Sequence, residues 1–174
     1  SIENWERLYG TPSPLGPTWV KAESAWNFSL YSRYATSVTL LLYRREDTAN
    51  PILVHELDPL VNKSGRVWHC WVPEEMARGA VYYGYRVDGP VGHRFDPRKI
   101  LLDPCAPSVH FPEGYSREAC MGPGPTDGRA PLGVLPVESP EFDWGRDDRP
   151  RHTHDAVIYE LHVKGFTART NSGV

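Results

Sequence analysis

Residues 66–72 read RVWHCWV and residues 80–88 read AVYYGYRVD. Both stretches are rich in β-branched and aromatic residues and lack a helical period, which indicates β-strands. The second stretch ends at Asp88-Gly89-Pro90, a turn signal because glycine can adopt a positive φ. Three further stretches with strand-like apolar patterns precede them, at residues 26–31, 38–43 and 52–57. Five short strands separated by turns predict a mainly-β fold, an antiparallel β-sandwich.

The chain is 174 residues long, whereas a complete (β/α)₈ barrel needs roughly 250 residues. This length allows one domain, or one domain plus part of another. The 15 glycines and 17 prolines exceed average usage, and such a composition favours turns and short strands over helices.

The segment 103–155 has no sustained period and contains nine of the 17 prolines. A connection of that length is uncommon inside a compact domain, and its scattered large apolar residues need a surface to cover them. We therefore expect an extended segment that packs on another domain. Residues 156–166, AVIYELHVKGF, then have the composition of a strand buried on both faces of a parallel sheet. Because such a strand needs neighbours, we expect it to belong to a second domain that is cut short.

The net charge of −3 and the absence of a basic run argue against nucleic acid and membrane surfaces as partners. Cys70, Cys105 and Cys120 are widely spaced, without a C-x-x-C pair or histidines at zinc-site spacing. We favour free thiols over a disulfide with one spare cysteine, which indicates a reducing, cytoplasmic location. The first residues contain no apolar run that could form the core of a signal peptide.

Several segments stand in a fixed order along the chain: GTPSPLGPT at 10–18, WNFSLYS at 26–32, VWH at 67–69, YGYRVDGP at 83–90, RFDP at 94–97, KILLDP at 99–104 and YELHVKGFT at 159–167. Together they resemble the isoamylase-type glycogen debranching enzymes, α-amylase-superfamily hydrolases of glycoside hydrolase family 13. The N-terminal module of these enzymes is a starch- or glycogen-binding module of carbohydrate-binding module family 48. The chain departs from relatives at Arg44-Arg45, where phenylalanine-aspartate is common, and at Cys105, where tyrosine is frequent.

The resemblance implies an immunoglobulin-like module at 1–102, a Pro/Gly-rich connector at 103–155 and the first strand of a truncated barrel at 156–174. It implies a parent enzyme that hydrolyses α-1,6 branch linkages of glycogen or related α-glucans, without a cofactor. Retaining hydrolysis uses two carboxyl groups about 5 Å apart. The family motifs that supply them do not occur in this chain, so we assign no catalytic residue and expect the chain alone to be inactive. Expected partners are an α-glucan and the catalytic barrel of the parent, with self-association through the unpaired strand as a further expectation.

Glucan binding requires exposed aromatic rings, because flat indole or phenol faces stack on the apolar faces of glucose. Trp19, beside a proline and outside the alternating strands, and Trp68 are the expected sugar contacts. Core packing is the competing interpretation for each ring, since burial of a tryptophan strongly stabilises a fold. Trp68 and Trp71 lie on opposite faces of one predicted strand, so one of the two is expected in the core.

Two further groups of polar residues compete with plainer interpretations. Glu160 and His162 lie two residues apart on the last predicted strand, where an acid/base pair competes with structural hydrogen bonding. His152-Thr153-His154-Asp155 lacks a third well-spaced ligand, so no metal is expected there. Alternative functions are a stand-alone glycogen- or starch-binding module and the N-terminal module of a branching enzyme or a trehalohydrolase.

Overall fold

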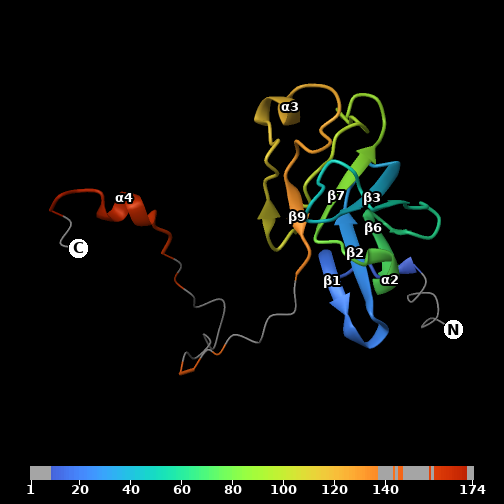
Figure 1. The fold of residues 1–174 in the computed structure, drawn as a ribbon, viewed down its shortest axis with the longest axis horizontal. Coiled ribbons are helices and arrows are strands. Elements are labelled where there is room, and N and C mark those ends of the chain that lie inside the picture. Colours follow the sequence, from blue (N-terminus) through green and yellow to red (C-terminus); the bar gives the residue numbers. More distant parts are fainter. Residues whose placement is uncertain (1–8, 137–142, 144, 147–156, 158, 172–174) are drawn as a thin grey trace. The chain divides into compact units, whose positions relative to one another are not determined.

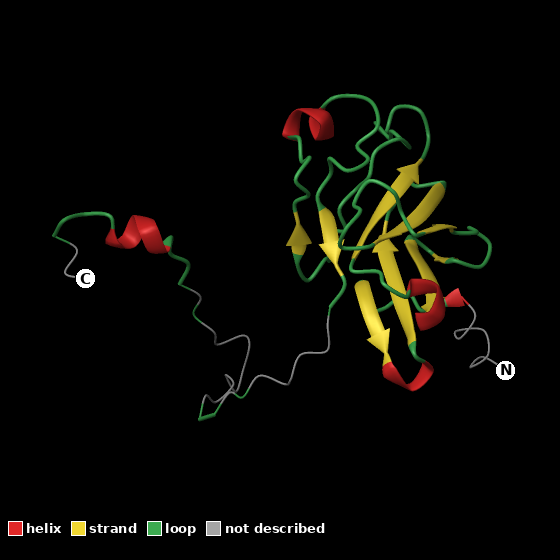
Figure 2. Ribbon diagram, viewed as in Figure 1, coloured by secondary structure: helices red, strands yellow, loops and turns green. Residues whose placement is uncertain are grey.

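A computed structural model describes residues 9–136, 143, 145–146, 157 and 159–171 of the chain. The chain divides into two compact units, Ser1–Glu138 and Ser139–Val174. The first unit contains two antiparallel β-sheets with a shared core between them (Figure 1, Figure 2). The predicted mainly-β, immunoglobulin-like sandwich is therefore confirmed.

The first sheet has four strands in the order β1 (Gly16–Val20), β2 (Ala25–Tyr31), β6 (Val67–Pro73) and β5 (Lys63–Ser64). A 3-10 turn, η1 (Lys21–Glu23), joins β1 to β2, and Ser24 after it adopts a φ of 45°. The register places Trp19 opposite Trp26. β2 and β6 are two of the predicted strands, and β1 is an edge strand that the sequence pattern did not indicate.

The second sheet has five strands in the order β4 (Leu53–Glu56), β3 (Ser37–Tyr43), β7 (Tyr82–Asp88), β9 (Leu132–Val134) and β8 (Val109–His110). β3, β4 and β7 correspond to the other three predicted strands. The α-helices are short: α2 (Glu74–Ala77), α3 (Arg117–Met121) and α4 (Val163–Thr167). Within the described ranges, none of the helices has the length and apolar character needed to cross a membrane.

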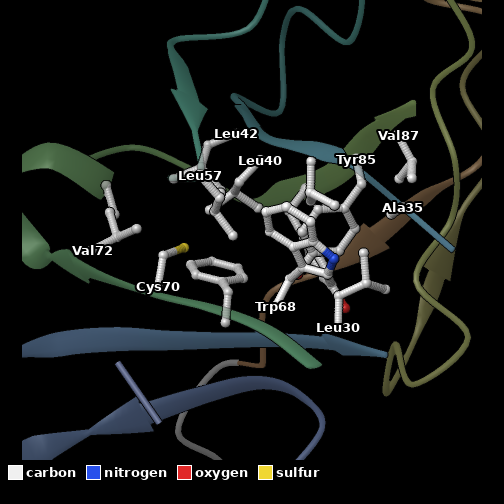
Figure 3. Packing of buried hydrophobic residues seen from close by; sticks show 14 of the residues in the cluster. Leu30, Ala35, Leu40, Leu42, Leu57, Trp68, Cys70, Val72, Tyr85 and Val87 are labelled. Atoms are coloured by element: carbon white, nitrogen blue, oxygen red, sulfur yellow. The ribbon is translucent and has the colours of Figure 1, made fainter. Parts of the chain in front are cut away.

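The core lies between the sheets and consists mainly of alternate residues of β2, β3, β6 and β7 (Figure 3). Its largest fully buried side chains include Phe28, Trp68, Tyr83 and Tyr85. The ring centroids of Phe28 and Tyr83 lie 5.5 Å apart, and those of Tyr83 and Tyr85 lie 6.0 Å apart in an edge-to-face arrangement. Aromatic pairs favour such tilted geometries, and their large apolar area makes this layer the main source of stability.

Residues 9–12 cover the outer face of the four-stranded sheet, so polar side chains on that face are buried. Asn27 is 2% exposed; its Oδ1 accepts the Thr11 N–H at 2.7 Å, and its Nδ2 donates to the Thr11 carbonyl at 3.0 Å. The Ser29 hydroxyl donates to the Pro12 carbonyl at 2.8 Å. The polar residues that alternate along β2 therefore bind main chain and do not face water.

The segment that follows residue 102 packs on the sandwich, whereas its composition predicted a connector. β9 pairs with β7, and β8 pairs with β9. Leu132 forms a second buried cluster with Leu41, Tyr43 and Ile100 on the outer face of the five-stranded sheet. The boundary predicted after residue 102 therefore moves, since the first compact unit continues to Glu138. Residues 133–137 are the one strand-like piece of this segment in the sequence and overlap β9, whereas β8, with two residues, has no readable period.

The second unit differs from the strand predicted over residues 156–166. Its described residues 143, 145–146, 157 and 159–171 contain helix α4 and no strand. A strand needs neighbours for its N–H and C=O groups, and none pairs with these described residues, whereas a helix satisfies such groups locally. Self-association through this segment stays a prediction.

Candidate functional site

Two tryptophans form one wall of a groove at the edge of the sandwich, which we call the tryptophan groove. Trp19 of β1 and Trp26 of β2 face each other across the strand pair, with ring centroids 5.2 Å apart and ring planes tilted by 56°. Both residues are partly exposed. Trp26 also packs against the main core and lies 6.4 Å from the ring of Phe28. The core thus supports the pair from below and leaves part of each ring open to a ligand.

The opposite wall of the tryptophan groove consists of Ala80, Val81, Leu135 and Pro136, and the groove has a volume of about 450 Å³. Backbone hydrogen bonds fix this wall. The Val81 N–H donates to the Tyr43 carbonyl at 2.8 Å, and the Leu135 N–H donates to the Val81 carbonyl at 2.9 Å. Residues beyond position 102 therefore help to build the groove.

Charged side chains occupy the rim of the tryptophan groove. Arg45, from the loop after β3, lines it together with Glu74 and Arg78, which lie in and just after α2. The Glu74 N–H donates to the Ser24 carbonyl at 2.9 Å, which holds α2 beside the turn between β1 and β2. Sheet pairing and this short helix together place aromatic and charged groups around one opening.

The combination of aromatic wall and charged rim suits a carbohydrate. Indole rings pack against the C–H groups of a pyranose, and guanidinium and carboxylate groups form hydrogen bonds with its hydroxyls. Glu74 is the one carboxylate among the described residues that line the groove. Retaining glycoside hydrolysis needs two carboxyl groups about 5 Å apart, a pair that the described lining of the groove does not contain.

The structure separates the two predicted sugar contacts. Trp19 lines the tryptophan groove, whereas Trp68 is 0% exposed and lies in the core (Figure 3). Lys63 Nζ lies 4.6 Å from the centroid of the Trp68 ring. With both faces covered, Trp68 offers no surface to a sugar, so burial removes it from the candidate contacts. The expectation that either Trp68 or Trp71 is a core residue is confirmed, and Trp71 is the partly exposed one.

Four aromatic or charged residues of the groove were not proposed as sugar contacts from the sequence: Trp26, Arg45, Glu74 and Arg78. Trp26 belongs to the alternating apolar positions of β2, a pattern that indicates a core residue. Its position at the groove follows from the pairing with Trp19 on β1. The two arginines come from separate loops, and only the packing of the sheets brings them to one opening.

One of the two polar residues predicted on the last strand, His162, has a local structural role. His162 Nδ1 accepts the Gly165 N–H at 2.9 Å and caps α4, and both His162 and Glu160 are exposed. This contact favours structural hydrogen bonding over an acid/base pair. The stretch 152–155 lies outside the described residues. Within the part of the chain that the structure describes, no group of three or more His, Cys, Asp or Glu side chains could hold a metal ion.

One buried carboxyl group ties the later segment to the core. Asp103 is 2% exposed; its Oδ2 accepts the Tyr83 hydroxyl at 2.9 Å, and its Oδ1 accepts the Cys105 N–H at 2.8 Å. Burial raises the pKa of Asp103 above its usual value, while these two hydrogen bonds act in the opposite direction. Asp103 does not line the tryptophan groove, so we assign it a structural role.

The family of the chain follows from its sequence over most of the sandwich. Residues 14–106 match carbohydrate-binding module 48, the isoamylase N-terminal domain. The chain belongs to this family. The matched residues include both groove tryptophans, Arg45 and α2, whereas Leu135 and Pro136 lie beyond the match. The predicted resemblance to the isoamylase type is thereby confirmed.

Curated relatives of this chain come from plants and bacteria. Isoamylase 1, chloroplastic, of Oryza sativa subsp. japonica is 36% identical over 176 residues, covering 96% of this chain and 21% of that protein. The glycogen debranching enzyme of Klebsiella pneumoniae is 35% identical, covering 91% of this chain and 24% of that protein. The glycogen operon protein GlgX homolog of Mycobacterium tuberculosis is 39% identical, with coverage of 91% and 23%. The chain therefore spans about a fifth to a quarter of the length of these relatives.

Solved structures share the fold. The catalytic module of the glycogen-degrading pneumococcal virulence factor SpuA, in complex with an inhibitor, matches with a TM-score of 0.54 at 20% identity, covering 98% of this chain and 23% of that one. The pullulanase of Paenibacillus barengoltzii, in complex with maltohexaose and α-cyclodextrin, matches with a TM-score of 0.50 at 21% identity, with coverage of 98% and 22%. At these identities the likeness concerns the fold alone.

Proposed function

We propose that the chain is the N-terminal part of a glycogen debranching enzyme that hydrolyses α-1,6-glucosidic branch linkages of glycogen or related α-glucans. Membership of the isoamylase N-terminal family supports this, as does 35% identity to a protein named glycogen debranching enzyme. Hydrolysis itself belongs to the catalytic barrel of the parent enzyme. Release of maltooligosaccharides from glycogen by the 174-residue chain alone would contradict this division of roles.

We further propose that the tryptophan groove binds the α-glucan. The observation that carries this proposal is the partly exposed pair of indole rings, 5.2 Å apart, beside a charged rim in a member of a carbohydrate-binding family. Sugars present C–H faces and dense hydroxyls, and this groove offers a partner for both. The ligand is expected to lie over Trp19 and Trp26 with its hydroxyls toward Glu74 and Arg78.

Affinity electrophoresis in glycogen-containing gels tests the groove. The wild-type chain is expected to be retarded, and Trp19→Ala is expected to weaken binding about tenfold, because it removes one stacked ring. Tyr31→Ala is the matched control, since Tyr31 is 52% exposed and does not line the groove. Thermal melts of both variants establish that they remain folded.

The outcomes distinguish whether the module binds glucan at all from whether it binds glucan at the tryptophan groove. A wild-type chain that migrates equally with and without glycogen contradicts glucan binding by the module. Retardation that survives in Trp19→Ala but is lost in Tyr31→Ala moves the binding site away from the tryptophan groove.

A second candidate function is packing against the catalytic barrel of the parent enzyme. An exposed aromatic pair favours it: Phe111 and Tyr115 are 57% and 41% exposed, with ring centroids 4.9 Å apart, on the segment beyond β8. Phe111→Ser in the full-length parent is expected to lower the barrel's melting temperature without affecting glycogen retardation of the isolated module. An unchanged melting temperature would contradict this packing role.

We propose a cytoplasmic location for the protein. Cys70, Cys105 and Cys120 are all free thiols, which is the usual state in a reducing compartment. Fractionation of the native source, followed by detection of the full-length protein, tests this. Recovery from an oxidising compartment would contradict it.

A further inference from the structure

Two arginines line the tryptophan groove, and a third lies beside it. Arg45 and Arg78 line the groove. Arg44 lies beside it, with its Nε 3.4 Å from the position that a Cβ on Gly79 would occupy. Gly79 also lines the groove and has a φ of 83°, a conformation that suits glycine. The missing side chain at this position leaves space for the guanidinium group of Arg44.

These guanidinium groups have no anionic partner in the part of the chain that the structure describes. None of the three arginines takes part in an ion pair or side-chain hydrogen bond there, although Glu74 lines the same groove. Glu23, Glu74 and Glu75 line a neighbouring pocket together with Arg78, whereas no carboxylate other than Glu74 lines the tryptophan groove among the described residues. A neutral sugar would leave these guanidinium groups without a directly paired anion.

We propose that the tryptophan groove binds a phosphate monoester carried by an α-glucan, with one glucose ring against the tryptophans and the phosphate among the arginines. This inference rests on the proposed glucan binding, since it uses the same aromatic wall. A phosphate monoester carries a charge of about −1.5 to −2 near neutral pH and three acceptor oxygens. The planar guanidinium group matches two such oxygens at once, and these charge-assisted bonds are stronger than neutral ones.

The groove provides space for both parts of this ligand. Its volume of about 450 Å³ falls within the range of roughly 300–1,000 Å³ that small-molecule sites occupy. A phosphate on the primary hydroxyl of glucose extends beyond the edge of the ring. The ring face can therefore remain on Trp19 while the phosphate reaches Arg45 and Arg78 at the rim.

Isothermal titration of the 174-residue chain tests the proposal with three probes: maltotetraose, maltotetraose with a 6-phosphate on one glucose, and inorganic phosphate. The phosphorylated sugar is expected to bind about tenfold more tightly than the neutral one at low salt. This advantage is expected to shrink at high ionic strength, because exposed charges are screened over a few ångströms there.

Two variants test whether the arginines cause the tighter binding of the phosphorylated sugar. Arg45→Gln combined with Arg78→Gln is expected to abolish the tenfold difference and to leave the affinity for maltotetraose within about twofold. Arg66→Gln is the matched control, since Arg66 is exposed, carries the same charge and does not line the groove. Circular dichroism of each variant monitors folding.

The failures are distinguishable. Equal affinity for the two sugars overturns phosphate recognition and leaves the proposed glucan binding intact, whereas failure of both sugars to bind overturns both. An advantage that persists in the double arginine variant also overturns the proposal. The proposal is also overturned if inorganic phosphate binds as tightly as the phosphorylated sugar, because the rim is then an adventitious ion site only.

Discussion

Replacing Tyr83 by phenylalanine tests whether the segment after residue 102 is an integral part of the sandwich. Tyr83 is 0% exposed on β7, and its hydroxyl donates to Oδ2 of Asp103 at 2.9 Å. Asp103 is 2% exposed and stands at the start of the segment that contains β8 and β9. That segment also supplies part of one wall of the tryptophan groove, Leu135 and Pro136. The hydrogen bond is therefore a buried link between a core strand and the part of the chain that composition alone marked as a connector.

The expected loss is about 2 kcal/mol in the free energy of unfolding, because a hydrogen bond to a charged group contributes roughly 1.5–3 kcal/mol. Phenylalanine keeps the ring and its contacts with Phe28 and Tyr85, so the change removes little more than one polar contact. For a domain of this size, such a loss lowers the melting temperature by about 6 °C. Thermal melts followed by circular dichroism at pH 7 measure the shift.

The shift is also expected to depend on pH. Burial raises the pKa of Asp103 above its ordinary value of 3.8, and the bonds from Cys105 and Tyr83 oppose this rise. Because the folded-state pKa exceeds the unfolded-state pKa, the stability of the fold decreases as pH rises from the unfolded value through the folded value. Loss of the Tyr83 bond raises the folded-state pKa further. The difference in melting temperature between wild type and Tyr83→Phe is therefore expected to be larger at pH 7 than at pH 4.

Tyr85→Phe provides the matched control, two residues along the same strand. Tyr85 is 2% exposed, and its hydroxyl has no hydrogen-bond partner among the described residues. An unpaired buried polar group costs roughly 1–3 kcal/mol, so Tyr85→Phe is expected to raise stability by about 1 kcal/mol. An unchanged melting temperature for Tyr83→Phe would refute the anchoring role of this bond. A loss in Tyr85→Phe as large as that in Tyr83→Phe would refute the assignment of the effect to Asp103.

Three further outcomes test the layers around the core. Gly84→Ala is expected to cost about 2 kcal/mol in urea unfolding, because a Cβ there would lie 2.9 Å from Ile100 Cγ2. Asn27→Ala is expected to lower the free energy of unfolding by about 2 kcal/mol and to speed proteolysis of the N-terminal segment. The reason is that the Asn27 amide forms hydrogen bonds of 2.7 and 3.0 Å with the Thr11 main chain. An unchanged rate of proteolysis would contradict this prediction. Burial raises the pKa of Cys70 to about 12, so mass spectrometry should find it unmodified by a thiol reagent at pH 8 in the folded chain, while the exposed Cys105 reacts.

Much of the sandwich was predictable because strand formation leaves a local signature. Alternation and β-branched or aromatic content indicated the strands near residues 26–31, 38–43, 52–57, 66–72 and 80–88, and the structure contains a strand in each place. β8 was not predictable, because two residues show no period, and the pairing of β9 with β7 was not predictable, because the two strands lie far apart in the sequence. For the same reason the sequence placed the end of the module too early.

The sequence by itself determined the sandwich, the family resemblance and the presence of Trp19 as an aromatic residue outside the alternating pattern. Only the tertiary structure decided which rings a ligand can reach. Trp68 has the same chemistry as Trp19, yet its position on the inner face of β6 buries it completely. Trp26, Arg45 and Arg78 meet Trp19 because strand register and sheet packing bring separate segments to one opening. A binding site of this kind depends on contacts between distant residues, and such contacts leave no local pattern in the chain.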